Sequence, residues 1–249
     1  MEYEEFLRRL NEIGQVGYVL SHRRGDTGIG KTLEDLLEIE ENNISGPDFA
    51  NYELKAGRKN SSSMLTLFTK APLPKGANNK LLEVFGYPER KRRPRGRQIS
   101  LIGQPVSDLI SSRKKELHVT VDSIRPNSVG LKLEVRGDRV YIANSRNVEA
   151  YYDQCILKEA FDRKYHGLAY VLADNKEQGG KEFFHFNEAY LLDGFGFTKF
   201  LRLIGSGELK LDLRMGHYAN GRPHDHGTAF RILPKHLPLC FENIQQILW

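Results

Sequence analysis

The segment that most constrains the fold is Pro47-Asp48-Phe49-Ala50-Asn51-Tyr52-Glu53-Leu54-Lys55. It places one carboxylate, Asp48, about a turn ahead of a second carboxylate and a lysine that are two residues apart. Side chains at alternate positions of a β-strand share a face, so Glu53 and Lys55 would point one way while Leu54 points into the core. We therefore expect a strand over residues 51–56, with Asp48 arriving beside Glu53 from the preceding turn or strand.

This arrangement has a definite chemistry. Two converging carboxylates form an oxygen-rich site that suits a hard divalent cation such as Mg²⁺. An adjacent ammonium group can orient a water molecule or stabilise charge on a phosphate. The pattern is typical of metal-dependent phosphodiester hydrolysis, although a solvated strand edge in a charged protein also produces it by chance.

The composition describes an ordinary globular chain. Its 249 residues, 39% apolar and 28% charged, fit one large domain or two lobes with a sizeable core. No run approaches the ~18 apolar residues of a membrane span, and the acidic, amphipathic N-terminus is not a secretory signal. Two cysteines, Cys155 and Cys240, are too few for a disulfide framework. We expect a cytoplasmic protein with no membrane partner.

Positive charge points to a polyanionic partner. The net charge is +5, and a run of basic residues lies between positions 90 and 97: Arg90, Lys91, Arg92, Arg93, Arg95 and Arg97. Pro94 and Gly96 interrupt the run, which indicates a loop. It is either a solvated loop or a phosphate contact, with Arg93 and Arg95 as candidates. Residues 88–97 are also the best candidate for a linker between lobes.

Hydrophobic periodicity predicts both helices and strands. Helices are expected at residues 2–13, 31–41 (with Thr32 as N-cap), 148–163, around 187–193 and at 238–249. Strands are expected at residues 51–56, 64–69 and 168–173, with a β-rich stretch over 117–143 and a strand-and-loop tail from Glu208.

A rival motif is Gly25-Asp26-Thr27-Gly28-Ile29-Gly30-Lys31-Thr32, which matches the P-loop pattern in full. It would make the chain a P-loop NTPase in which Lys31 reaches a terminal phosphate. However, four polar residues separate it from the short apolar segment before it, and the downstream chain lacks alternating strands and helices. A turn that leads into a helix explains the glycines equally well.

An ordered set of short matches carries a family resemblance. Residues 28–34 (Gly-Ile-Gly-Lys-Thr-Leu-Glu) resemble the G-x-V-G-x-x-L-E segment of MutH-like nucleases, and Asp48 follows Glu34 by fourteen positions. Glu41-Asn42-Asn43-Ile44, Glu53-Leu54-Lys55, the stretch 65–72 and Gly221-Arg-Pro-His-Asp-His-Gly227 follow in order. Together they resemble the MvaI/BcnI branch of type II restriction endonucleases, within the PD-(D/E)xK nucleases, and especially its MvaI type. The matches are strong over about residues 25–75 and 221–233, and Asp48 is two residues closer to Glu53 than in MutH itself.

The resemblance implies an α/β (α+β) fold with a mixed central sheet flanked by helices, in two lobes around a DNA cleft. The catalytic lobe would span 1–87, completed by about 148–175, and 88–249 would mainly recognise DNA. Such a monomer would cut double-stranded DNA at a short pseudopalindromic site, CC/WGG, nicking the strands one after the other. Its cofactor would be Mg²⁺, with Mn²⁺ as a substitute, and a cognate methyltransferase would act on the same site without needing to bind this chain.

Roles follow for individual residues. Asp48, Glu53 and the carbonyl of Leu54 would hold the metal, and Lys55 would position the attacking hydroxide or accept its proton. Glu34, otherwise a surface acid on a helix, would orient Lys55 or support a second cation. Lys70 would contact phosphate or merely flank a strand.

Base reading is expected in the tail, from Arg222, His224, Asp225, His226 and Arg231. An arginine can contact guanine and an aspartate can accept from cytosine in the major groove. His226 would suit a central A·T pair. The alternatives are a metal site at His224 and His226, a polar surface turn, or a DNA-binding protein without catalysis.

Overall fold

The computed structural model describes residues 2–39, 51–88, 114–165, 167–218 and 220–247. Asp48, Arg93, Arg95, residues 41–44 and nearly all of the predicted linker lie outside these ranges. The chain forms two compact units. The first comprises Met1–Leu65, Ile156–Leu203 and Ile232–Trp249, and the second comprises Thr66–Cys155 and Ile204–Arg231. The two units therefore interleave in sequence.

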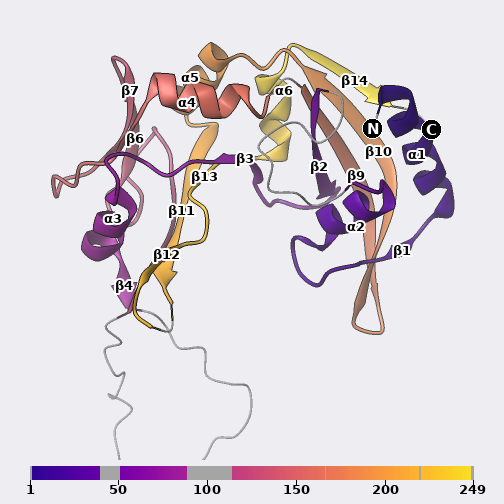
Figure 1. The fold of residues 1–249 in the computed structure, drawn as a ribbon, viewed down its shortest axis with the longest axis horizontal. Helices are drawn as coiled ribbons and strands as arrows, with labels where there is room; N and C mark the ends of the chain where they lie inside the picture. The colour runs from indigo at the N-terminus through magenta and orange to yellow at the C-terminus, as the bar shows by residue number, and fades with distance from the viewer. Residues whose placement is uncertain (1, 40–50, 89–113, 166, 219, 248–249) are drawn as a thin grey trace, which may run out of the picture. The chain divides into compact units, whose positions relative to one another are not determined.

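The first unit contains a sheet with helices packed on it (Figure 1), and Glu53, Lys55 and Glu34 lie on its elements β2 and α2. Its helices are α1 (Tyr3–Val16), α2 (Gly28–Leu36), α4 (Gln154–Asp162), α5 (Phe197–Ser206) and α6 (Leu237–Cys240), with a short 3-10 turn at Pro234–His236. Its strands are β1 (Val19–Leu20), β2 (Tyr52–Arg58), β9 (Gly167–Gln178), β10 (Lys181–Asp193) and β14 (Asn243–Ile247).

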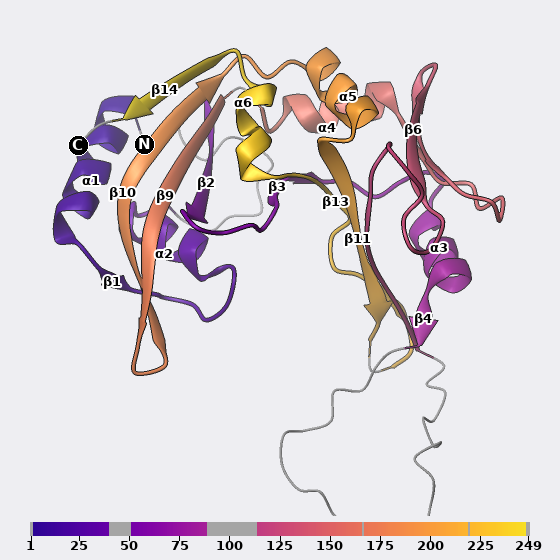
Figure 2. The ribbon, with the colours of Figure 1, turned by 180° about the vertical axis from the view of Figure 1, so that it is seen from behind.

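The sheet of the first unit is mixed. Its strands run in the order β1, β10, β9, β2, and β14 also pairs with β10. The long hairpin of β9 and β10 is antiparallel, whereas β2 runs parallel to β9. Figure 2 shows β14 alongside β10. This arrangement confirms the predicted mixed sheet flanked by helices.

One face of that sheet is covered by α1 and α2. Phe6 and Leu10 of α1 and Leu33 of α2 are fully buried against apolar side chains of the strands, including Leu54 and Val171. Burial of this continuous apolar area is the main force that holds the helices to the sheet.

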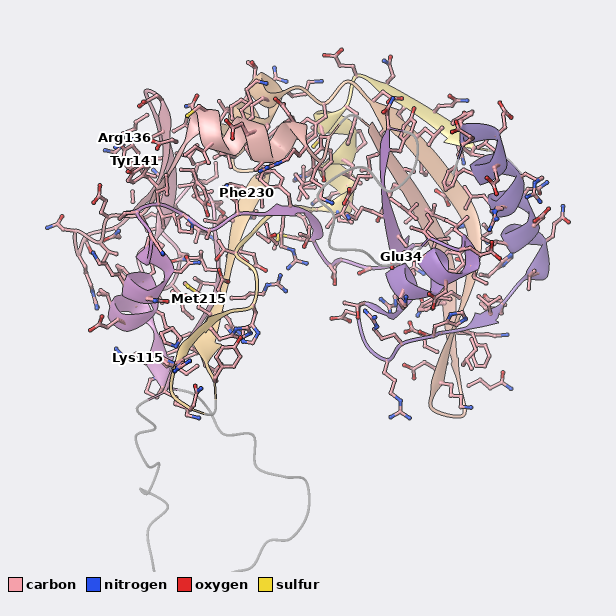
Figure 3. All side chains as sticks on the ribbon, viewed as in Figure 1. Glu34, Lys115, Arg136, Tyr141, Met215 and Phe230 are labelled. Atoms are coloured by element: carbon pink, nitrogen blue, oxygen red, sulfur yellow. The ribbon has the colours of Figure 1, made fainter. Side chains whose placement is uncertain are left out.

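Strands dominate the second unit. A sheet runs in the order β3 (Leu65–Thr69), β13 (Ala229–Ile232), β11 (Leu209–His217), β5 (Lys115–Val121) and β4 (Tyr87–Pro88), and β12 (Pro223–Asp225) pairs with β11. A smaller sheet contains β6 (Lys132–Arg136), β7 (Arg139–Ala143) and β8 (Tyr151–Asp153), and the unit also contains helix α3 (Ala77–Phe85). Figure 3 labels Phe230 and Met215 on the larger sheet, where both are buried.

Several predicted elements are confirmed, and others are wrong. The strands at 51–56, 64–69 and 168–173, the helix at 2–13 and the β-rich stretch are present. The segment 187–193 is not a helix but the end of β10, because it pairs along its length with β9 and β14. The segment 148–163 begins as β8 before α4 starts, and most of 238–249 is β14 instead of a helix.

The cap predicted at Thr32 is also wrong, because α2 begins earlier, at Gly28. Thr32 is buried inside the helix, where its hydroxyl donates to the carbonyl of Gly28 at 2.7 Å. In the described part of the chain, no helix is both long and apolar enough to cross a membrane.

Candidate functional site

Strand β2 separates its side chains as the sequence predicts. Leu54 belongs to the core under α1 and α2, while Glu53 and Lys55 share the opposite face. Glu53 retains only 3% of its exposed area, which is unusual for a carboxylate unless cationic or polar groups surround it.

Two lysines surround that carboxylate. The ammonium of Lys55 donates to Glu53 Oε1 at 2.6 Å, and that of Lys164 lies 3.1 Å from Oε2 and 3.4 Å from Oε1. The glutamate side chain is 4% exposed, whereas the side chains of Lys55 and Lys164 are 28% and 27% exposed. The two lysines are therefore partly open to solvent while they contact a buried carboxylate. Sequence reasoning missed Lys164, which lies 111 positions from Glu53.

A hydrogen bond fixes the first residue of β2. Tyr52 donates its phenol hydrogen to Asp193 Oδ2 at 2.9 Å. The two side chains meet across Gly167 of β9, which is paired with Tyr52 of β2 on one side and with Asp193 of β10 on the other. A Cβ at Gly167 would lie 2.7 Å from the Tyr52 ring, so only glycine leaves room for the bond. Burial and the Asp193 hydrogen bond raise the pKa of Tyr52 to about 12.

Glu34 and Lys55 line one surface pocket of about 300 Å³. Leu54 contributes from the same strand, and Arg23 and Lys31 contribute from the segment around the start of α2. Figure 3 labels Glu34 on α2, the helix that lies beside β2. Glu34 and Lys55 therefore line the same pocket from two separate elements.

The described residues fit a divalent cation in part. Glu53 supplies a buried carboxylate, whose oxygens are ligands that suit a hard divalent cation. Lys55 and Lys164 already pair with those oxygens, so a cation would have to compete with the two ammonium groups. Within the described ranges, no group of three or more His, Cys, Asp or Glu side chains could hold a metal ion. The second carboxylate of the predicted set, Asp48, lies outside those ranges.

The glycine-rich segment has structural roles that explain its P-loop match. A Cβ at Gly28 would lie 2.2 Å from the carbonyl oxygen of Arg23, and Gly25 has φ of +84°. The hydroxyl of Thr32 is bonded to the backbone, and Lys31 pairs with Asp35 at 2.8 Å. The preceding strand, β1, has two residues and pairs antiparallel with β10, unlike the buried parallel strand of a P-loop. The geometry gives the NTPase alternative no support.

Histidines gather in the second unit near β12. The rings of His224 and His226 are 4.2 Å apart between centroids, and the edge of His118 on β5 lies against His226 at 6.0 Å. Burial is the main cause that lowers the pKa of His226, and neighbouring His224, His118 and Arg214 add to it. His118 was not among the predicted site residues, although its strand and the loop had both been recognised.

Asp225 is held by the protein itself. Its Oδ2 accepts from the amide of Asn78 at 2.6 Å and from the hydroxyl of Thr228 at 3.1 Å, and its Oδ1 accepts from the N–H of Gly227 at 2.9 Å. Asn78 lies in the first turn of α3, is buried, and was also missed by sequence reasoning. The Asp225 carboxylate therefore stabilises the conformation of the loop, and fewer of its hydrogen-bond acceptor positions remain for a DNA base than we expected.

The other residues predicted to contact DNA differ in how exposed their side chains are. Arg222 is exposed at the tip of the loop. Arg231 pairs with the buried Asp212 at 2.7 Å. Lys70 follows β3, and its backbone bonds to Thr228 and to the hydroxyl of Tyr152. The side chain of Lys70 is half-buried.

Comparisons with known proteins agree with this description. The model of the MvaI/BcnI restriction endonuclease family matches residues 7–241. A solved complex of restriction endonuclease MvaI with its cognate DNA substrate is 29% identical, covers 100% of both chains and has a TM-score of 0.79. A structure of MvaI in the absence of DNA is also 29% identical, covers 98% of this chain and 97% of its own, and has a TM-score of 0.55. No curated protein matches the chain.

Proposed function

This chain belongs to the MvaI/BcnI restriction endonuclease family, and from that premise we propose that it hydrolyses double-stranded DNA with a divalent cation at Glu53 and Lys55. The observation that carries the proposal is the geometry of β2. A buried carboxylate and a lysine share the strand face that is not covered by α1 and α2, and the ammonium is 2.6 Å from the carboxylate. That pair is what metal-assisted phosphodiester hydrolysis needs beside a scissile phosphate.

Each residue has a proposed role. Asp48, Glu53 and the carbonyl of Leu54 would hold Mg²⁺, for which Mn²⁺ can substitute. When bound, the cation makes a coordinated water more acidic and neutralises charge on the phosphate. Lys55 positions the attacking oxygen or accepts its proton, and Glu34, which lines the same pocket, keeps Lys55 aimed.

The second unit would supply recognition. Arg222 and His224 are proposed to contact base edges, and His226 to face a central A·T pair. Asp225 would mainly hold this loop in shape, since three donors already bind its carboxylate. Lys70, Arg93, Arg95 and Arg231 would contact phosphates or support that surface, which gives affinity without sequence information.

The proposed product is a cut at CC/WGG in two steps. A chain with one set of catalytic residues that acts as a monomer can cut only one strand at a time, so it must rebind in the opposite orientation. Digestion of a supercoiled plasmid should then accumulate a nicked circle before the linear form, and sequenced ends should carry one-nucleotide 5′ overhangs. A methyltransferase that modifies the same site would block both steps.

Replacement of Lys55 tests the assignment of the site. Lys55→Met should lower single-turnover cleavage by about a hundredfold or more, because it removes the proton acceptor or its positioning charge. DNA binding in Ca²⁺ should persist. Lys158→Met, which removes an exposed lysine from α4, is the matched control and should cut normally. Cleavage by Lys55→Met at the control rate would refute the site, and intact DNA with the unsubstituted chain would leave only the DNA-binding alternative.

A further inference from the structure

The buried carboxylate of Glu53 is shared by two cations, and the proposed mechanism uses only one of them. Lys55 approaches Oε1, whereas Lys164 approaches chiefly Oε2. Among the described residues, these three side chains together carry a net charge of +1 around a carboxylate that is almost removed from solvent. The proposed mechanism gives Lys164 no role, although its ammonium contacts the proposed metal ligand.

Lys164 is held in place by the backbone around it. It follows α4, and its N–H and that of Tyr165 both donate to the carbonyl of Phe161 at 3.0 Å. The Tyr165 ring is 6% exposed, stacks on Phe161 at 5.4 Å and meets the edge of Phe195 at 5.5 Å. Because a buried aromatic residue anchors the next position, Lys164 is not a freely moving surface lysine.

The pairing of β9 with β2 explains why Lys164 lies close to Glu53. Strand β9 begins at Gly167 and runs parallel to β2, with Gly167 paired to Tyr52 and Leu168 paired to Glu53. The residues that precede β9 therefore lie at the end of the sheet where β2 begins. Glu53 and Tyr165 are close enough that the carboxylate, after burial, contributes to holding the pKa of Tyr165 well above its usual value.

We infer that Lys164 is a positioning residue that holds the Glu53 carboxylate before the cation binds and competes with the cation for it. This inference rests on the proposed function, because it needs Glu53 as a cation ligand. Lys164 keeps the buried carboxylate charged and oriented without metal, and its ammonium must give up Oε2 when a divalent ion takes that oxygen. The lysine thus raises the concentration of divalent ion that the enzyme requires.

Calorimetric titration of the whole protein with Ca²⁺, without DNA, tests this competition independently of catalysis. Lys164→Met removes the charge but keeps the length of the side chain, and Lys55 remains to balance Glu53. We expect Lys164→Met to bind Ca²⁺ about tenfold more tightly than the unsubstituted chain, because one positive charge beside the ligand is gone. The Mg²⁺ concentration for half-maximal cleavage should fall by a similar factor.

Two further variants separate charge from packing. Lys164→Arg keeps the positive charge, so its Ca²⁺ affinity should stay within about threefold of the unsubstituted chain. Lys158→Met removes a lysine of α4 whose partner, Asp162, is exposed, and it should leave Ca²⁺ affinity unchanged. Lys164→Gln replaces Lys164→Met if that variant does not fold. Unchanged or weaker Ca²⁺ binding by the neutral variant, or tighter binding by Lys164→Arg, would overturn the inference.

A variant at Glu53 tests the proposed cation ligand separately from the role of Lys164. Glu53→Gln should lose Ca²⁺ binding, because a neutral amide is a poor ligand for this hard cation. If Glu53→Gln binds Ca²⁺ like the unsubstituted chain, the proposed function fails. If Glu53→Gln loses binding while Lys164→Met behaves like Lys158→Met, only the role of Lys164 fails.

Discussion

Replacement of Asn78 by alanine tests whether the DNA-reading loop is anchored as the structure indicates. The side-chain amide of Asn78 donates to Asp225 Oδ2 at 2.6 Å and to Thr228 Oγ1 at 3.1 Å. Asn78 is buried at the start of α3. Asp225 is the last residue of β12 and lies between His224 and His226 in the sequence. Asn78→Ala removes both hydrogen bonds and leaves the Asp225 carboxylate with the hydroxyl of Thr228 and the N–H of Gly227 as donors.

The size of the loss follows from these contacts. A hydrogen bond to a charged group contributes about 1.5 to 3 kcal/mol and a neutral one about 0.5 to 1.5 kcal/mol. The Asn78–Asp225 hydrogen bond should contribute near the lower end of the range for charged groups, because Asp225 is exposed and water can replace the Asn78 amide as its donor. Alanine also removes the buried Asn78 carbonyl oxygen, which has no hydrogen-bond partner among the described residues, and it favours the helix. We expect a net loss of about 1 to 2 kcal/mol in the free energy of unfolding.

Urea denaturation followed by circular dichroism measures that loss, and Asn11→Ala on the exposed face of α1 is the control. The control should change stability by less than about 0.5 kcal/mol. Asn78→Ala should also discriminate less well between the recognised site and sites with one base pair changed, because the histidines lose their anchored loop. An Asn78→Ala stability equal to that of the control, with unchanged discrimination, would refute the anchoring network.

Asn78→Asp sharpens the test through pH. It would place a second carboxylate beside Asp225, and two carboxylates this close cannot both be ionised at low cost. A proton shared between them is bound at acid pH and lost as the pH rises. The destabilisation by Asn78→Asp should therefore be larger at pH 8 than at pH 5, whereas that by Asn78→Ala should hardly change.

Two predictions concern the start of β2. Gly167→Ala should destabilise the protein by about 1 to 3 kcal/mol and slow cleavage, because its Cβ would lie 2.7 Å from the Tyr52 ring and 2.8 Å from Asp193 Oδ1. The control is Gly205→Ala in α5, where a Cβ meets nothing within 4 Å. Thermal unfolding compares the two variants. Tyr52→Phe should cost about 1 to 2 kcal/mol at neutral pH. Because the pKa of Tyr52 is raised from 10.0 to about 12, the stability it contributes is present below pH 10 and lost between pH 10 and 12. The difference in melting temperature between the parent and Tyr52→Phe should shrink over that interval, and a constant difference would count against the hydrogen bond.

Local patterns predicted the elements whose signals do not depend on distant partners. Alternation placed Glu53 and Lys55 opposite Leu54, and the helical spacing of Phe6 and Leu10 identified α1. The prediction failed for 187–193 because its apolar residues fit both periods, and the choice is made by pairing with β9 and β14. Residues 238–249 failed for the same reason, since β14 forms only where β10 offers its edge.

The contacts that the sequence could not predict are those set by strand register. Residues 168–173 are apolar at nearly every position, so their pattern shows a buried strand but not its neighbour. The register with β2 depends on Gly167, where the missing side chain admits the Tyr52–Asp193 hydrogen bond. Once that register is known, the chain just before β9 must lie near the start of β2, and Lys164 becomes a candidate partner of Glu53. In a parallel pair of this kind, the place to look for unrecognised active-site residues is therefore the segment that precedes the neighbouring strand.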